Sequence, residues 1–192
     1  HYQFDQAHVD LRPLCQFAGA RLLHDEAIGI DTANRCVLCR TRPPVGYDVL
    51  SINIGSRPGV AAVPGAADFT IPVKPINRFV EHWSDLVERV LEQPGPQRIG
   101  VIGAGAGGVE MVLTAQHRLR YLLNERGRDG EELEFHLISR SERILPAFDE
   151  GVSARFEKAL NKRGIVVHRG SGAAEVSRGG LTLTDGTHIE LD

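Results

Sequence analysis

The chain of 192 residues is 42% hydrophobic and 24% charged, and its formal net charge is −3. This composition is typical of a globular protein and gives no indication of binding to nucleic acid or to an anionic membrane surface. No apolar run approaches the roughly 20 residues of a membrane-spanning helix, and no basic and apolar start indicates a secretory leader. Three cysteines are too few for a disulfide scaffold and suit a reducing compartment. We therefore expect a cytoplasmic location and no membrane contact by this chain.

The first segment of the chain predicts short strands. In chain order we expect a strand over residues 20–30, a turn at 31–34, a strand over 35–41, a buried strand over 48–54 and an irregular Gly- and Pro-rich crossover over 55–75. Cys36 and Cys39 have the spacing of a redox pair. Positions three apart in a strand point to opposite faces, which favours two structural thiols over a redox pair.

An amphipathic helix is predicted over residues 75–92, because apolar side chains recur there at helical spacing. These side chains are Ile76, Phe79, Val80, Trp83, Leu86, Val87, Val90 and Leu91. Trp83 lies within this stripe, so a place in the core is favoured over a cofactor contact. Pro94-Gly95-Pro96 then separates the chain into two segments.

The second segment alternates strands and helices, as in a doubly wound α/β fold. The expected elements are strands over 98–102, 133–138 and 165–168, helices over about 107–125 and 149–163, and a terminal three-stranded β-meander over 173–177, 181–184 and 187–191. Gly164 is placed to end the second helix, and Asp185-Gly186 indicates a hairpin turn.

The most informative motif is the glycine turn, which comprises Gly103, Ala104, Gly105, Ala106, Gly107 and Gly108. It lies between a predicted strand and a predicted helix, which is the arrangement that binds a dinucleotide pyrophosphate. Gly103 permits the tight turn, Gly105 lets phosphates approach the backbone, and Gly108 lets the helix pack on the strand. The helix then directs free N–H groups and the positive end of its dipole at the anion.

Two alternative interpretations of the glycine turn remain: a purely structural turn, and the turn of a methyltransferase. A methyltransferase turn usually has an acidic residue before its first glycine, whereas Val101-Ile102 stand here. The pattern therefore favours dinucleotide binding.

The end of the strand over 133–138 bears on the choice of nucleotide. NAD sites usually place an acidic residue there, and this chain has Ser139-Arg140-Ser141 instead. A guanidinium beside hydroxyl groups suits a 2′-phosphate, so Ser139 and Arg140 favour NADP over NAD. A solvated Arg140 is the alternative, and Glu142 could take the ribose role. Glu110, in the first turn of the helix, is explained by the helix dipole or by a place near the nicotinamide.

Other chemistry finds little support in the sequence. The eight histidines are scattered without an acidic partner at ligand spacing, so we expect no metal site. No Ser/His/Asp or Gly-x-Ser-x-Gly arrangement is present, and we name no catalytic acid or base.

Several stretches in order resemble the NAD(P)-binding domain of the flavin-dependent pyridine nucleotide–disulfide oxidoreductases. They are the glycine turn with Val109-Glu110, and residues 143–146, 164–168 and 181–186. The branch that contains type II NADH:quinone dehydrogenases and sulfide:quinone reductases is the most similar. In the first segment, residues 47–56, Pro64-Gly65 and the crossover helix resemble the part that closes over FAD. Residues 7–11 and 45–48 resemble the flavoprotein module fused to bacterial selenide, water dikinase.

The resemblance implies FAD and NAD(P)H as cofactors, with Gly55 and Ser56 at the edge of the flavin. It implies that hydride passes from NAD(P)H to FAD and that electrons then pass to a second acceptor such as a quinone. The family has an earlier glycine motif for FAD that this chain lacks, and Cys36 and Cys39 do not match its reactive cysteine pair. We therefore expect an interior part of a longer flavoprotein.

The expected organisation is a partial FAD-binding domain with the crossover helix over residues 1–95, and a Rossmann-like NAD(P)-binding domain over residues 96–192. The expected partners are a nicotinamide nucleotide and a flavin held together with missing parts of the parent chain. The sequence does not decide whether the protein forms a homodimer. Quinone use would imply a peripheral contact of the parent protein with the inner membrane. The alternative is a nucleotide-binding module without redox activity, with a selenide, water dikinase fusion as its parent.

Overall fold

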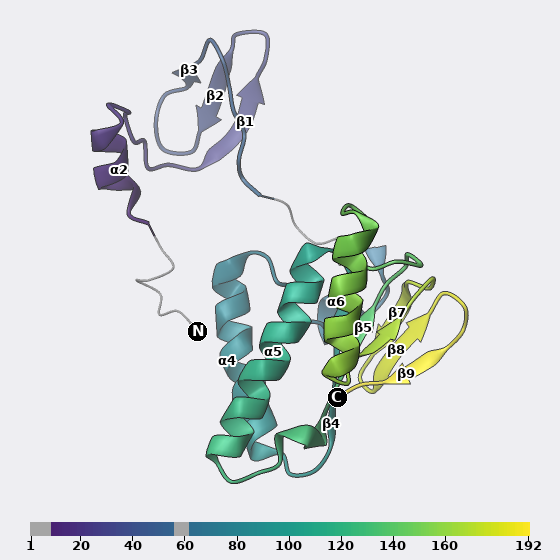
Figure 1. Ribbon diagram of the computed structural model, residues 1–192. Coiled ribbons are helices and arrows are strands. Elements are labelled where there is room, and N and C mark those ends of the chain that lie inside the picture. Colours follow the sequence, from purple (N-terminus) through teal and green to yellow (C-terminus); the bar gives the residue numbers. More distant parts are fainter. Residues whose placement is uncertain (1–8, 56–61) are drawn as a thin grey trace. The chain divides into compact units, whose positions relative to one another are not determined.

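The computed structural model describes residues 9–55 and 62–192, and the chain divides after Gly55 into two compact units. Figure 1 shows both units and labels most of their helices and strands. None of the helices in these two ranges is long and apolar enough to cross a membrane. The fold class is the expected mixed α/β architecture with a parallel sheet.

The described residues of the first unit, 9–55, form one helix and a three-stranded antiparallel sheet in the order β1-β2-β3. Its elements are α2 (Leu11–Phe17), β1 (Ala27–Asp31), β2 (Cys36–Cys39) and β3 (Val45–Gly46). The predicted turn forms, because the Asp31 carboxylate accepts hydrogen bonds of 3.0 and 2.7 Å from the backbone N–H and side-chain amide of Asn34. Helix α2 was not predicted, although Asp10 caps it by accepting from the Arg12 N–H at 2.9 Å.

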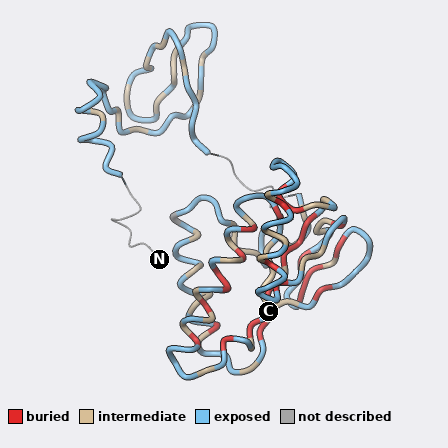
Figure 2. Tube along the Cα trace, viewed as in Figure 1, coloured by how far each residue is buried: buried red, intermediate tan, exposed pale blue. Residues whose placement is uncertain are grey.

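The prediction of a buried strand over residues 48–54 was wrong. These residues have no regular structure, and the side chains of Val49 and Ile54 are 90% and 89% exposed. An apolar run is buried only where another layer covers it, and no residue between 9 and 55 is buried in this unit. Figure 2 shows the same contrast, with the buried residues confined to the second unit.

The second unit contains the α/β layers. Its helices are α3 (Ala66–Phe69), α4 (Ile76–Glu92), α5 (Ala106–Glu125) and α6 (Glu150–Lys162), with a short 3-10 turn at Gly130–Glu132. Strands β4 (Gln97–Ile102), β5 (Leu133–Ile138) and β6 (Val166–His168) form a parallel sheet in that order. These elements confirm the predicted alternation, with ends that differ from the prediction by a residue or two.

Alternation along β5 separates two cores, because successive side chains of a strand point to opposite faces of the sheet. Phe135 and Leu137 are buried in the core on the helical side, where α5 lies against β4 and β5 and α6 against β6. Ile138 is buried in the second core, on the side of the meander.

The meander consists of β7 (Ala173–Ser177), β8 (Gly180–Leu183) and β9 (His188–Glu190), antiparallel in that order. The predicted hairpin turn forms between β8 and β9, where Gly186 has φ +87. The expected cap also forms at the end of α6, where Gly164 has φ +69. The meander joins the parallel sheet through a 2.9 Å hydrogen bond from the Asp192 N–H to the Arg98 carbonyl.

Helix α4 belongs to the second unit and packs against its core. Its Val90 is buried in the helical-side core, and Trp83 and Val87 are half-buried against that core. Trp83 therefore contributes to the core, as the apolar stripe predicted. The structural division at residue 55 lies earlier in the chain than the expected domain boundary at residue 95.

Candidate dinucleotide site

The glycine turn connects the end of β4 to the start of α5. Gly105 is the N-cap residue of α5, and it has no side chain that could accept a hydrogen bond from the first turn of the helix. The first bond of the helix runs from the Val109 N–H to the Gly105 carbonyl at 3.1 Å. The N–H groups that precede it have no partner within a helix, and they carry the positive end of the helix dipole. This helix start can therefore bind an anion through backbone groups.

Glycine stands at positions 103, 105 and 108 of the motif for three different structural reasons. Gly103 has φ +107, in the left-handed region that favours glycine. A Cβ at Gly108 would overlap the carbonyl oxygen of Gly103, so only glycine permits this close approach. A Cβ at Gly105 would meet no protein atom within 4 Å, and the residue is exposed. The space above Gly105 is therefore open to a ligand.

The loop that follows β5 lies beside the glycine turn. The Leu145 N–H donates a 2.8 Å hydrogen bond to the Ala104 carbonyl, and Leu145 is buried with φ +51. The Ser153 hydroxyl donates to the Ile144 carbonyl at 2.9 Å. These contacts hold the loop against the turn in a backbone conformation that a leucine rarely adopts.

Ser139 and Arg140, which the sequence predicts to favour NADP over NAD, lie in the first part of the same loop. Ser139 is buried, and its hydroxyl donates to the Ser141 carbonyl at 2.8 Å and accepts from the Ser141 N–H at 3.2 Å. Ser139 therefore shapes the loop, whereas the neighbouring Arg140 is exposed. Ser139 and Arg140 thus differ in their access to solvent.

A second loop, residues 169–172 after β6, packs against residues 140–142 of the first loop. The sequence analysis did not predict this contact. The Gly170 N–H donates to the Ser141 carbonyl at 3.3 Å, and a Cβ at Gly170 would overlap the Glu142 carboxylate. A Cβ at Gly172 would lie 3.2 Å from the Arg140 Cβ. The Gly170-Ser171-Gly172 sequence after a predicted strand was the available signal for this close packing.

Glu110 is exposed in the first turn of α5. It borders a small cavity of about 100 Å³ between the starts of α5 and α6. The other lining residues are Ala106, Val109, Leu145, Phe148, Val152 and Phe156. The structure thus brings Glu110 to the same end of the sheet as the glycine turn.

Of the residues predicted for the flavin, Gly55 is exposed with φ +74 at the end of the first unit, and Ser56 lies outside the described residues. In the described ranges no group of three or more His, Cys, Asp or Glu side chains could hold a metal ion, and Cys36 and Cys39 are free thiols.

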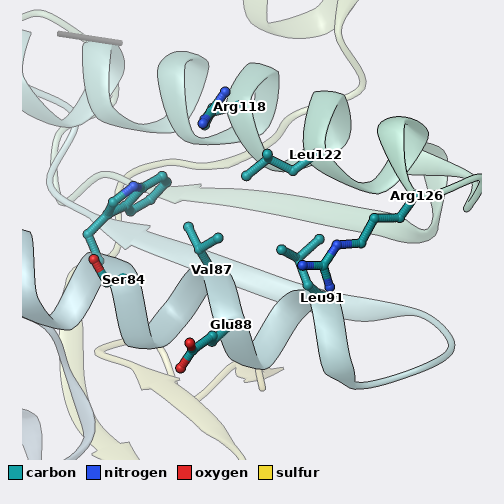
Figure 3. A pocket seen from close by; sticks show the side chains of 8 residues that line it. Ser84, Val87, Glu88, Leu91, Arg118, Leu122 and Arg126 are labelled. Atoms are coloured by element: carbon teal, nitrogen blue, oxygen red, sulfur yellow. The ribbon is translucent and has the colours of Figure 1, made fainter. Parts of the chain in front are cut away.

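A larger groove of about 380 Å³ lies between α4 and α5 (Figure 3). Trp83, Val87 and Leu91 line it from α4, with Ser84 and Glu88 of the same helix. Arg118 and Leu122 of α5 and Arg126, the residue after α5, line the other side. The Trp83 ring also packs on Phe79, with ring centroids 6.1 Å apart. The α5 side of this groove is formed by the middle and the end of that helix, away from the glycine turn at the helix start.

The comparisons with known proteins show the family. The chain belongs to the pyridine nucleotide-disulphide oxidoreductase family, whose model matches residues 15–192. An NADH dehydrogenase-like protein of Mycobacterium tuberculosis is 32% identical over 177 residues, which cover 90% of this chain and 43% of that protein. The chain therefore spans less than half the length of this relative. Family and relatives together support a flavin and a nicotinamide nucleotide as cofactors.

Solved structures confirm the fold. The sulfide:quinone oxidoreductase of Aquifex aeolicus is similar with a TM-score of 0.74 and 18% identity, over 99% of this chain and 44% of that one. An engineered water-forming NADPH oxidase bound to NADPH is similar with a TM-score of 0.59 and 22% identity, over 94% of this chain and 38% of that one.

Proposed function

We propose that this chain is the nicotinamide-nucleotide-binding portion of a flavin-dependent oxidoreductase, which passes hydride from NAD(P)H to FAD and then electrons to a second acceptor. The observation that carries the proposal is the uncapped start of α5 at Gly105, with open space in front of it. Family membership supports the oxidoreductase class.

In this proposal the backbone of residues 103–108 holds the nucleotide pyrophosphate. The N–H groups at the start of α5 donate to the phosphate oxygens, and the helix dipole favours their negative charge. Ala104 and Ala106 add no side chain that would block this approach. Glu110 borders the nicotinamide end, where a carboxylate can accept from a carboxamide N–H. These residues bind and orient the nucleotide, and none of them transfers a proton.

The flavin fits the described residues less well. When bound, a flavin accepts the hydride and supplies the electrons for the second acceptor. Gly55 and Ser56 are proposed at its edge, but the stretch that leads to Gly55 is exposed, and residues 9–55 enclose no buried position. The comparisons do not support a fusion to selenide, water dikinase.

For the nucleotide we propose a preference for NADPH, with Arg140 and the following Ser141 at the 2′-phosphate. The engineered NADPH oxidase carries three successive substitutions, Asp to Ala, Ala to Arg and Met to Ser, which replace an acid and introduce an Arg before a Ser. Ser139-Arg140-Ser141 presents the same order of Arg and Ser without an acid. Exposure of Arg140 leaves its guanidinium accessible for a bidentate phosphate contact.

The test is a calorimetric titration of this chain with NADPH and with NADH. Replacing Arg140 by Ala should weaken NADPH binding about tenfold to a hundredfold, since charge-assisted hydrogen bonds are lost, and leave NADH binding nearly unchanged. Arg155→Ala removes an equal charge from an exposed position of α6 and serves as the matched control. Tighter binding of NADH, lost in Glu142→Gln, would assign the ribose to Glu142 instead. Absence of binding by either nucleotide would contradict the proposal.

A further inference from the structure

Two histidines face one another across β5 and β6, with His136 inside β5 and His168 at the end of β6. The His136 Nδ1 and His168 Nε2 atoms are 3.1 Å apart, and the rings are stacked with centroids separated by 5.4 Å. One N–H must lie between these two nitrogens, with a lone pair of the other ring accepting it. The pair is therefore hydrogen-bonded as long as one of the two rings keeps its lone pair, and it joins two neighbouring strands through side chains.

The outer nitrogen of His136 has no such partner. Its Nε2 atom is buried without a hydrogen-bond partner in the described residues, and the nearest carboxylate oxygen, on Glu134, lies 4.0 Å away. Burial lowers the pKa of His136, and proximity to His168 and to Arg98 on β4 lowers it further, against the opposite effect of Glu134. Burial also lowers the pKa of His168, while Asp185 in the β8–β9 turn raises it. Neutral rings are thus favoured in the folded arrangement.

The histidine pair is directly connected to the candidate dinucleotide site. The His168 carbonyl accepts a 2.7 Å hydrogen bond from the Ser139 N–H, at the start of the loop that carries Arg140. Two residues later, the Gly170 N–H donates to Ser141 in the same loop. The end of β6 therefore holds both loops that enclose the proposed ribose site.

We propose that the His136–His168 pair is a proton-sensitive latch that sets the affinity of the nucleotide site. With both rings neutral, their hydrogen bond holds the end of β6 against β5 and keeps the loops at residues 139–142 and 169–172 together. Protonation of one ring places a cation in this half-buried position but keeps the hydrogen bond, whereas protonation of both rings removes the accepting lone pair and places two N–H groups on cationic rings against one another, with the nitrogens 3.1 Å apart. The rings then separate toward water, and the loops lose their common support.

This inference rests on the proposed function, because it regulates the same nucleotide site. Reciprocity requires that a nucleotide which binds the closed latch more tightly also opposes protonation of the rings. The two quantities to measure are therefore the pH dependence of nucleotide affinity and the effect of the nucleotide on the titration of the histidines.

The experiment compares this chain with a double variant, His136→Gln and His168→Gln, whose amides can hydrogen-bond to one another but do not titrate. NADPH is titrated calorimetrically between about pH 8 and about pH 5.5, a range that spans the ordinary titration of histidine. Affinity of the unaltered chain should fall by about tenfold more than that of the double variant. Protonation of the 2′-phosphate occurs in both proteins and cancels. His82→Gln, an exposed change on α4, is the matched control and should keep the unaltered profile.

If NADPH affinity falls with pH equally in the double variant and in the unaltered chain, the proposed role of the histidine pair is wrong. If that variant fails to fold, the histidine ring signals of the unaltered chain are followed by NMR with and without NADPH. Saturating NADPH should then lower the titration midpoints of His136 and His168, and unchanged midpoints would overturn the inference. Binding at about pH 8 with no latch effect refutes this inference alone. Absence of nucleotide binding at that pH refutes the proposed function and this inference with it.

Discussion

Gly108 and Gly107 are neighbours in the glycine turn, yet the structure constrains them very differently. A Cβ at Gly108 would overlap a backbone oxygen of the strand end, which cannot move aside as a flexible side chain can. A Cβ at Gly107 would meet nothing within 4 Å. The fold itself therefore requires glycine at position 108 because of close packing, apart from any role in ligand binding, as it favours glycine at position 103 because of its φ of +107.

We expect Gly108→Ala to lower the free energy of unfolding by about 2 kcal/mol or more, because the added methyl group forces the start of α5 away from β4. Gly107→Ala is the matched control, and as an exposed helical position it should raise stability by about 0.5–1 kcal/mol. Urea unfolding without nucleotide measures both. Equal stability of the two variants would show that the close approach at Gly108 does not hold in solution.

At the scale of the element, α6 depends on a single side chain for its start. The Asp149 carboxylate accepts a 3.0 Å hydrogen bond from the Val152 N–H, and this is the side-chain bond that caps the helix. Asp149→Ala should cost about 1 kcal/mol in unfolding free energy. Asp149→Asn keeps an equally good capping oxygen and should change stability little. A large loss in the Asn variant would indicate that charge, not capping, matters at this position.

The strand pair β5–β6 should make the stability of the second unit depend on pH. The pKa values of His136 and His168 are lowered in the folded protein, mainly by burial. The unfolded chain therefore binds more protons, so stability falls as the pH drops below about 6.5 and the loss continues until the lowered folded values are passed. Urea midpoints at about pH 7.5 and about pH 5.5 measure this loss. The His136→Gln, His168→Gln variant should lose less stability over this range.

At the scale of the whole molecule, the two units differ in their cores. No residue of 9–55 is buried as a whole, whereas the second unit buries Phe135, Leu137 and Leu119 completely. Burial of apolar area is the main favourable term in folding, so the second unit holds most of the stability of this chain.

Hydrogen exchange of the whole chain should reveal this difference. We expect amides of β4, β5 and α5 to be protected at least about a hundredfold more strongly than amides in residues 9–55, because local opening is easier where few apolar contacts must break. Mass spectrometry of exchanged peptides measures both units in one sample. Equal protection in β1, β2 and β5 would contradict this assignment of stability.

Local patterns were enough to predict much of the second unit. β5 and β7 have the predicted bounds, α4 differs from the prediction by one residue at its start, and α6 differs by one residue at each end, because the period of apolar side chains and the capping residues are local properties. The prediction of a buried strand over residues 48–54 was wrong for the converse reason. The apolar side chains of this run favour burial, but burial depends on a covering layer that the run itself does not encode.

The sequence by itself determined the fold class, the glycine turn and the family resemblance, since each depends on residues close together in the chain. Only the tertiary structure decided which residues meet. It bonded the Ser139 hydroxyl to Ser141, placed residues 169–172 beside Arg140, and brought His136 and His168 into contact across 32 positions of sequence. Such contacts follow from the register of parallel strands and the packing of loops at their ends, which no short stretch of sequence specifies.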